Sequence, residues 1–493
     1  MGVDMVEFLK DKDILVVGGT GFLGKVFIEK ILRVQGDVGH IFTLVRAIDL
    51  QSAQAKLEKE VFCSDLFESL RERYRDGYSR FMEQKVIPVV GDVISDDLGM
   101  QEKTREELSK RVDIIVNTAA TTSFYERYDV ALNVNTMGAA NVVRFGKSCP
   151  KLQILCHVST AYVNVGRSGI IREEALTSAE APSKTGGTMP SPWDVECERE
   201  LIRKTLEEIR TLNSTQDKIE KRQMKELAEQ RAREFGWPNA YVFTKAMAEV
   251  MVDHLRGDIP VVIVRPSIIE STLSEPFPGW IEGQRMVDPL FIAYGKGQLS
   301  RFPAAPNLIV DMIPVDMVAN GMISCLRRHA SNPGLYIYHL TTSVQNPLLY
   351  FTGIKAAYEY FKLNPCKDKK GQKIINIKKA KALHNMEIFR RYMTLHYKIP
   401  LQILHVVDLL LCGFKRKQYN RLLRTYNFVM KLAQLYEPFI FFEGRFDNAN
   451  TRRLWEELSK EDAEKFKFDV KCIEWTDYLY HVHIPGLMKH VSS

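Results

Sequence analysis

A glycine-rich turn near the start of the chain constrains the fold more than any other feature of the sequence. The turn follows the apolar run Ile14–Val17, which has the length and β-branched content of a buried strand, and it precedes a helical pattern over residues 25–35. Glycines at such a junction permit a tight turn and a close approach of the backbone to a pyrophosphate, whose charge meets the positive end of the helix. The strand before and the helix after make the motif specific. The sequence therefore predicts a dinucleotide-binding turn, with the candidate contacts Gly18, Thr20, Gly21, Phe22, Leu23 and Gly24.

Short apolar runs alternate with helical patterns through the first part of the chain. Continuous apolar runs of strand length are typical of parallel strands that are buried on both faces. Strands that alternate with helices favour a doubly wound α/β sheet of the Rossmann type. The predicted strands are Ile14–Val17, Ile41–Val45, Val86–Val90, Ile114–Val116, Gln153–Val158 and Val261–Val264.

Composition indicates a globular protein of a reducing compartment. Of the 493 residues, 45% are apolar and 26% are charged, which excludes collagen-like and largely disordered classes. No uncharged apolar run approaches the ~20 residues that a membrane-spanning helix needs. The eight cysteines form no C-x-x-C pair, and the N-terminus has neither a basic stretch nor an apolar signal core. We therefore expect reduced thiols, no transmembrane helix, and no signal or transit peptide.

Charge and turn signals divide the chain into two regions. The net charge of +7 arises from +11 over residues 346–493 and −4 over residues 1–345. We expect a dinucleotide-binding domain over 1–350 and a mainly helical C-terminal domain over 370–493. The basic C-terminal region suits an anionic partner, whether nucleic acid, a phospholipid surface or a phosphate-bearing substrate, and a solvated basic face is the alternative.

A charged segment over residues 194–235 interrupts the strand–helix alternation. It is rich in Glu, Lys, Arg, Gln and Leu, so we expect two exposed or half-exposed helices inserted into the first domain. Two roles are equally compatible with this pattern: a cover over the substrate entrance, or a surface extension.

Two side chains at strand ends bear on the choice of cofactor. Dinucleotide folds that prefer NAD place an acid after the second strand, where it holds the ribose 2′-hydroxyl. Here Arg46 follows the strand, and its guanidinium suits a 2′-phosphate, which favours NADPH. An unengaged surface arginine is the alternative. Asp92, after the third predicted strand, either reaches the adenine edge or caps its own loop.

Tyrosine and lysine are spaced for general acid catalysis in the segment Tyr241–Lys245. At i and i+4 the two side chains share one face of a helix, and an ammonium beside a phenol is expected to lower the pKa of the phenol. Such a phenol donates a proton to an oxygen that gains charge during hydride transfer, and Lys245 can also hold the nicotinamide ribose. Thr160, at the end of a strand, is expected to bond the substrate oxygen, with the adjacent Ser159 as the alternative.

Other chemistries lack their motifs. The sequence has no G-x-S-x-G elbow and no H-E-x-x-H helix. The close pair His481 and His483 lacks Cys or acidic partners at ligand spacing, so we predict no metal site.

Several motifs together carry a family resemblance. Besides the glycine-rich turn they are 157–163 (HVSTAYV), 236–245 (GWPNAYVFTK), 275–280 (EPFPGW), 311–317 (DMIPVDM), 446–451 (FDNANT) and 483–487 (HIPGL). In these motifs the chain resembles the alcohol-forming fatty acyl-CoA reductases, which are extended short-chain dehydrogenase/reductases, and it looks closest to the plant members without a plastid leader. The resemblance spans almost the whole chain, and the last two motifs look like the accessory domain of the family.

The resemblance implies an activity, a cofactor and a location. Long-chain acyl-CoA and two NADPH would give a primary alcohol, free CoA and two NADP through an enzyme-held aldehyde. Thr160 and Tyr241 would hold the carbonyl oxygen, and no nucleic acid would be involved. The expected location is the cytoplasmic side of the endoplasmic reticulum membrane or the cytosol. The alternatives are a single-step NADPH-dependent reductase of another carbonyl substrate and a non-catalytic NADP-binding scaffold.

The region Arg390–Arg424 interleaves apolar stretches with basic residues. This pattern suits peripheral binding in the plane of an anionic membrane surface. Ordinary buried helices with basic ends are the alternative.

Overall fold

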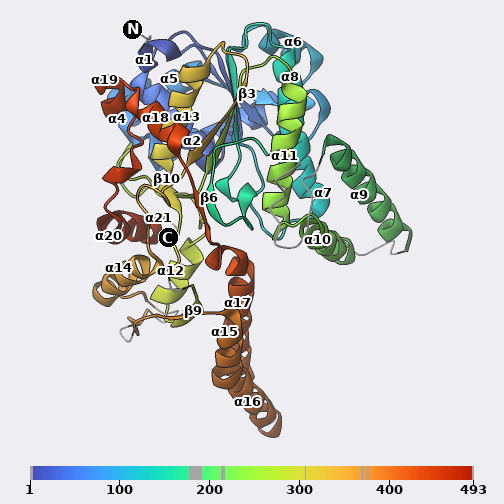
Figure 1. The fold of residues 1–493 in the computed structure, drawn as a ribbon, viewed down its shortest axis with the longest axis vertical. Helices are drawn as coiled ribbons and strands as arrows, with labels where there is room; N and C mark the ends of the chain where they lie inside the picture. Colours follow the sequence, from blue (N-terminus) through green and yellow to red (C-terminus); the bar gives the residue numbers. More distant parts are fainter. Residues whose placement is uncertain are drawn as a thin grey trace. The chain divides into compact units, whose positions relative to one another are not determined.

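A computed structural model describes residues 4–176, 191–212, 217–305, 307–367, 371–374 and 377–490 (Figure 1). The chain forms two compact units, and neither is contiguous in sequence. The first comprises 1–282, 311–346 and 444–472, and the second comprises 283–310, 347–443 and 473–493. The division expected from the sequence, 1–350 and 370–493, stays a prediction about domains. Residues 283–310 lie in the second unit although they precede residue 350, and residues 444–472 lie in the first unit although they follow residue 370.

A seven-stranded parallel sheet forms the centre of the first unit, in the order β11-β7-β5-β4-β1-β2-β3. This confirms the predicted doubly wound sheet. The predicted strands are all present, and three of them have the predicted bounds. The strands of the sheet are β1 (Ile14–Val17), β2 (Ile41–Val45), β3 (Val86–Val90), β4 (Ile114–Asn117), β5 (Ile154–Val158), β7 (Val261–Pro266) and β11 (Leu335–Leu340).

Helices cover both faces of this sheet, and α8 and α11 lie on the face opposite α2 and α13 (Figure 1). Apolar side chains from the strands and from α8 and α11 form one continuous buried core. The helices of the first unit are α1 (Met5–Leu9), α2 (Phe22–Val34), α3 (Leu50–Leu57), α4 (Glu68–Tyr74), α5 (Tyr78–Lys85), α6 (Glu102–Ser109), α7 (Tyr128–Ala131), α8 (Gly138–Lys147), α9 (Pro192–Leu212), α10 (Asp217–Glu234), α11 (Ala240–Arg256), α13 (Val315–His329), α18 (Ala449–Glu456) and α19 (Lys460–Lys465).

Two short parallel pairs extend the first unit. β8 (Ile268–Glu270) pairs with β10 (Met312–Pro314), and β6 (Gly169–Ile171) pairs with β13 (Gly444–Phe446). The second pair joins the returning C-terminal segment to the unit that holds the large sheet. Helices α9 and α10 are the two predicted helices of the insertion.

The second unit is mainly helical, as the sequence indicated for the C-terminal region. Its only strands among the described residues are the parallel pair β9 (Arg301–Pro303) and β12 (Lys381–Leu383). Its helices are α12 (Asp288–Gly295), α14 (Tyr350–Leu363), α15 (Met386–Met393), α16 (Ile399–Leu410), α17 (Arg416–Ile440), α20 (Trp475–Asp477) and α21 (Ile484–His490). Among the helices of the described ranges, none is both long enough and apolar enough to cross a bilayer.

Candidate active site

The glycine-rich turn connects β1 to α2 with no room for side chains. A Cβ on Gly24 would lie 2.3 Å from the carbonyl oxygen of Gly18, and a Cβ on Gly18 would lie 2.7 Å from the backbone nitrogen of Ala119. Gly18 also has a φ of +92°, a conformation that favours glycine. The turn therefore brings bare backbone to the carboxyl edge of the sheet, which is the arrangement that a pyrophosphate requires.

The remaining predicted contacts of this turn lie at the start of α2. Thr20 is half-buried in the turn, and Phe22 and Leu23 are buried. Gly21 precedes the helix without a side-chain cap, so the first amides of α2 keep the positive end of the helix available to an anion.

A loop after β8, which contains the motif 275–280, packs against the start of α2, a contact that the sequence analysis did not predict. The ring of Trp280 stacks on Phe22 with centroids 5.4 Å apart, and the Lys25 ammonium pairs with Glu282 at 2.5 Å. Lys30, one turn further along α2, pairs with Glu275. These contacts fix the helix that would receive the pyrophosphate.

The two strand-end residues proposed for the cofactor have different surroundings. Arg46 is exposed directly after β2. Asp92 follows β3 and accepts a hydrogen bond from the backbone N–H of Ile94 at 3.2 Å. Asp92 thus caps its own loop, which is one of the two roles that the sequence allowed. A half-buried carboxylate with a further oxygen can still contact a base edge.

Tyr241 and Thr160 meet at the carboxyl end of β5. The Tyr241 phenol lies beside the Thr160 hydroxyl, and that hydroxyl donates to the carbonyl of Pro266 at 3.4 Å. The ring of Phe124, in the loop after β4, stacks against Tyr241 with centroids 6.0 Å apart. Phe124 is a site residue that the sequence did not reveal, because loop aromatics carry no periodic signal.

The electrostatics of Tyr241 differ from the sequence expectation. Burial raises the pKa of Tyr241 to about 12, and the adjacent Thr160 hydroxyl opposes that rise. Lys245 does not produce the predicted lowering, because its ammonium donates instead to the backbone carbonyl of Val158 at 2.6 Å. The phenol is therefore fully protonated near neutral pH, which is the form that a proton donor needs.

Lys245 is buried on the same face of α11 as Tyr241. Burial lowers the pKa of Lys245 to about 8, and the nearby carboxylate of Glu249 opposes the change. Burial of the His157 ring and the nearby charge of Lys245 together hold the pKa of His157 well below its usual range. His157 on β5 is thus a neutral neighbour of the lysine.

Ser159 and Thr160 are both buried, but only Thr160 meets the phenol. The backbone N–H of Ser159 donates to the carbonyl of Val264, while its hydroxyl has no hydrogen-bond partner within the described residues.

Helix α11 is fixed at its N-terminus and along its inner face. Asn239 caps the helix through a bond from the Val242 N–H at 3.1 Å. Asn135, in a widened helical turn before α8, donates to the hydroxyl of Thr244 at 2.9 Å. Trp237 donates from its indole N–H to the carbonyl of Val163 at 3.0 Å. These contacts set the height and rotation of Tyr241 and Lys245 at the sheet edge.

The inserted helices pack beside this site. Tyr128 donates to the carboxylate of Glu198 on α9 at 2.7 Å, and Arg127 pairs with Glu220 on α10 at 2.6 Å. The Lys225 ammonium lies 5.3 Å from the ring centroid of Tyr125, the neighbour of Phe124. The insertion thus contacts the loop that flanks Tyr241, and its role at the substrate entrance stays a prediction.

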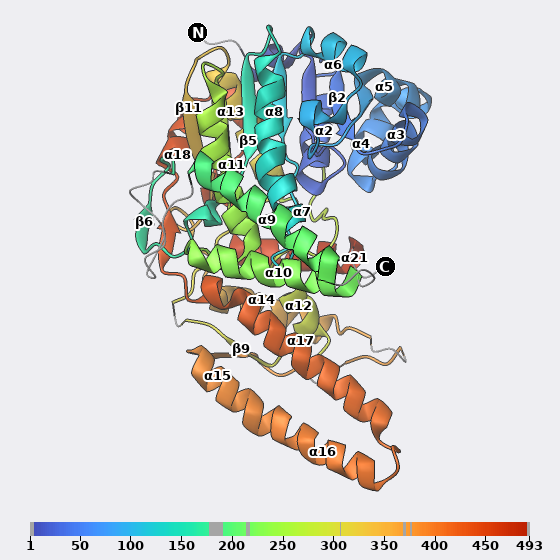
Figure 2. The same ribbon diagram turned by 90° about the vertical axis from the view of Figure 1, so that its right-hand side faces the viewer.

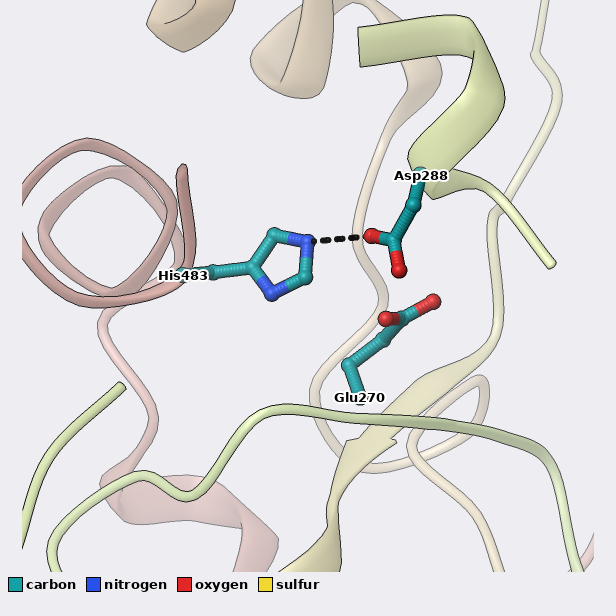
Figure 3. Close-up of side chains that lie close together, drawn as sticks. All are labelled: Glu270, Asp288 and His483. Carbon is teal, nitrogen blue, oxygen red and sulfur yellow. Dashed lines mark ion pairs between the residues drawn. The ribbon is translucent and has the colours of Figure 1, made fainter. Parts of the chain in front are cut away.

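The two C-terminal histidines lie in the second unit in different environments. His481 is exposed, whereas His483 is buried and its Nε2 lies 3.1 Å from a carboxylate oxygen of the equally buried Asp288 (Figure 3). Ligand spacing in the sequence could not reveal this acidic neighbour, because it comes from a distant segment.

The fold and the glycine turn define a dinucleotide-binding protein of the extended short-chain reductase class, with a phenol, an ammonium and a hydroxyl gathered at the sheet edge. Comparison with solved structures shows the same fold in two proteins of low sequence identity. The terminal R domain from the myxalamid PKS-NRPS biosynthetic pathway aligns with a TM-score of 0.58 at 16% identity, over 97% of this chain and 91% of that one. A nonribosomal peptide synthetase reductase domain from Mycobacterium tuberculosis aligns with a TM-score of 0.55 at 16% identity, over 99% and 93%.

Sequence comparison identifies the family. Family models described as male sterility protein match residues 16–322 and 396–493. The chain is 44% identical to probable fatty acyl-CoA reductase 5 of Arabidopsis thaliana, over 100% of this chain and 99% of the relative. It is 38% identical to the alcohol-forming fatty acyl-CoA reductase of Simmondsia chinensis, over 99% of both. The chain belongs to the fatty acyl-CoA reductase family, and it is an NAD(P)-binding oxidoreductase.

Proposed function

We propose that the protein reduces long-chain fatty acyl-CoA to primary alcohol with two equivalents of NADPH, through an aldehyde that stays on the enzyme. Membership of the family supports the acyl-CoA substrate, and the name of the Simmondsia relative supports the alcohol product. The observation that carries the catalytic proposal is the approach of the Tyr241 phenol to the Thr160 hydroxyl at the carboxyl edge of the sheet.

The residues at the sheet edge fit NADPH. Gly18 and Gly24 leave a cradle that a Cβ would fill, at the positive end of α2. Arg46 offers an exposed guanidinium where a 2′-phosphate would lie, which supports NADPH over NADH. Lys245 would hold the nicotinamide ribose, and Asp92 would contact the adenine edge. When bound, NADPH supplies the hydride that the carbonyl carbon accepts.

Thr160 and Tyr241 would orient the thioester oxygen and stabilise the charge that it gains. Tyr241 donates its proton to that oxygen, which gives a hemithioacetal. The Tyr241 phenolate then takes back the hydroxyl proton as the hemithioacetal carbon–sulfur bond breaks, so CoA leaves as thiolate and the carbonyl reforms as an aldehyde. In the second reduction Tyr241, once reprotonated, donates to the aldehyde oxygen and the alcohol is complete.

We further propose that the protein works at the cytosol-facing surface of the endoplasmic reticulum membrane or in the cytosol, and that its association with the membrane is peripheral. Long-chain acyl substrates partition into membranes, which supports a surface location. The absence of a membrane-spanning helix among the described residues is compatible with it.

One assay tests the function. Purified full-length protein is incubated with NADPH and an acyl-CoA series from about C16 to C26, the extractable products are identified, and NADPH oxidation is followed. Primary alcohol with two NADPH consumed for each molecule supports the proposal. Aldehyde alone would favour a single-step reductase, and NADPH binding without turnover would favour a non-catalytic scaffold.

A further inference from the structure

A helical hairpin in the second unit exposes an apolar surface that its own packing leaves uncovered. Helix α15 continues through a widened turn into α16, and α17 returns beside it (Figure 2). The turn between α16 and α17 is made by Leu411–Lys415. Leu410 and Phe414 at this end of the hairpin are 77% and 81% exposed. Apolar side chains so exposed require an explanation when many of them lie together.

The exposed residues of α16 lie on one face. Ile399, Ile403, Val406 and Leu410 recur at helical spacing, and all four are exposed. The opposite face contains the buried residue Leu401 and packs toward α17. Helix α16 therefore has two apolar faces, and its contact with α17 uses one of them.

A cavity inside the hairpin does not account for the exposed face. A space of about 260 Å³ lies in the second unit between the two arms of the hairpin. Its lining includes Leu401, Leu404, Leu422, Tyr426 and Val429. The exposed residues Ile403, Val406 and Leu410 are absent from that lining, so the exposed face is a separate feature.

The charge around this face has one sign. Between residues 409 and 436 there is no Asp or Glu, and the six basic residues are Lys415, Arg416, Lys417, Arg421, Arg424 and Lys431. The one acid of α16, Asp408, is buried and lies 3.8 Å from the guanidinium of Arg416. Lys417, Arg421 and Arg424 are exposed and share one face of α17 by their spacing. Basic and apolar side chains mix at the turn itself, where the Lys415 ammonium lies 5.5 Å from the ring centroid of Phe414.

We propose that the α16–α17 hairpin is the surface by which this protein docks on an anionic phospholipid bilayer. The apolar face of α16 and the side chains of Leu410 and Phe414 enter the interface, while Lys417, Arg421 and Arg424 contact lipid phosphates. An exposed apolar stripe with an exclusively basic border is complementary to such a surface. A second copy of the chain fits less well, because a symmetric contact would bring the same cations together.

Vesicle sedimentation of the full-length protein tests the apolar part of the surface. Vesicles of phosphatidylcholine alone are compared with vesicles that also contain phosphatidylserine. The variant Leu410→Glu with Phe414→Glu should lower partitioning to both at least about tenfold, since it places charge where side chains enter the interface. The matched control changes two exposed residues of α14 in the same unit, Phe351→Glu and Leu363→Glu, and should bind like the original protein.

A second variant tests the charge. Reversal of Lys417, Arg421 and Arg424 to Glu should lower binding to the anionic vesicles by about 100-fold or more and should remove its salt dependence. The same charge change made at three exposed lysines of the first unit should have a much smaller effect: Lys103, Lys110 and Lys151. Circular dichroism and thermal unfolding show whether each variant is folded.

Three results would overturn the proposal. One is failure of the original protein to bind anionic vesicles at low salt. Another is unchanged binding by the folded Leu410→Glu and Phe414→Glu variant. The last is a dimer of the original protein in light scattering that becomes a monomer in the Leu410→Glu and Phe414→Glu variant, while this variant still binds vesicles. That result would make the exposed face of α16 a contact between two copies of the chain. None of these results depends on the reductase activity, so the function and the docking surface are tested separately.

Discussion

The phenol of Tyr241 lies beside the hydroxyl of Thr160, although the two residues come from opposite sides of the inserted helices in the sequence. The strand that ends before Thr160 and the helix that begins before Tyr241 both reach the carboxyl edge of the sheet. Catalytic residues in open α/β sheets are expected at this edge.

The neighbouring hydroxyls of Ser159 and Thr160 should differ in importance. Thr160→Val removes the hydroxyl beside the Tyr241 phenol and should lower kcat/KM by about 100-fold, as for a lost donor to a developing oxyanion. Ser159→Ala removes a hydroxyl without a partner among the described residues and should change kcat/KM little. Steady-state kinetics with one acyl-CoA compare the two, and Thr160→Ser should restore most of the rate. Equal losses of kcat/KM in Thr160→Val and Ser159→Ala would contradict the proposal that Thr160, and not Ser159, bonds the substrate oxygen.

The rate should fall as pH rises through the pKa of Lys245. Burial lowers that pKa to about 8, so the ammonium is lost above this value and with it the charged contact proposed for the nicotinamide ribose. A profile of kcat/KM against pH should show a falling limb near 8, and Lys245→Met, although much slower, should lack it. Because the folded protein releases this proton before the unfolded chain does, the contribution of Lys245 to the free energy of unfolding rises from about pH 8 to its ordinary pKa. A rate that is flat from pH 7 to 10 would contradict the role of the ammonium.

The apolar strands were predictable because each is a continuous run with few alternatives. The seventh strand, β11 (Leu335–Leu340), was not predicted, because two tyrosines and a histidine interrupt its apolar pattern. The pairing of β6 with β13 also could not be predicted from the sequence, since it joins segments that are far apart in the chain. For the same reason the sequence suggested one boundary near residue 350, whereas the chain passes between the units more than once.

The site was predictable where chemistry requires a fixed spacing. The glycine turn and the Tyr241–Lys245 pair follow from spacing alone. Phe124 and Trp280 were missed because they lie in loops and contact the site only through the fold. The predicted lowering of the pKa of Tyr241 was wrong in direction, because the phenol is buried and the Lys245 ammonium bonds a backbone carbonyl. Neither of these features can be read from the sequence around Tyr241.

The glycine turn should tolerate no Cβ at Gly24. Gly24→Ala places a methyl 2.3 Å from the Gly18 carbonyl oxygen and should destabilise the fold by about 1–3 kcal/mol. It should also weaken NADPH binding, because the turn must shift. Gly77→Ala is the matched control: its Cβ would meet nothing within 4 Å, and the expected change is within about 1 kcal/mol. Thermal unfolding with and without NADPH measures both effects, and an unchanged Gly24→Ala protein would refute the close packing of the turn.

Arg46 should set the preference between the two dinucleotides. Arg46→Asp removes the guanidinium and introduces an acid, so the ratio of kcat/KM for NADPH to that for NADH should fall at least about tenfold. The exposed Arg73 is a suitable control position, since its guanidinium bonds the Arg33 carbonyl at 2.7 Å. If Arg46→Asp and Arg73→Asp left the ratio equally unchanged, the cofactor preference would have another origin.

The most direct test is the loss of one oxygen atom in Tyr241→Phe, measured by product formation and NADPH binding on the same preparation. The account predicts that alcohol formation falls by about 100- to 10,000-fold while the affinity for NADPH stays within about threefold. Tyr162→Phe, which removes a phenol bonded to the Asp311 carbonyl, controls for the general effect of this change. Near-normal alcohol formation by a folded Tyr241→Phe protein would contradict the central claim that this phenol supplies the proton.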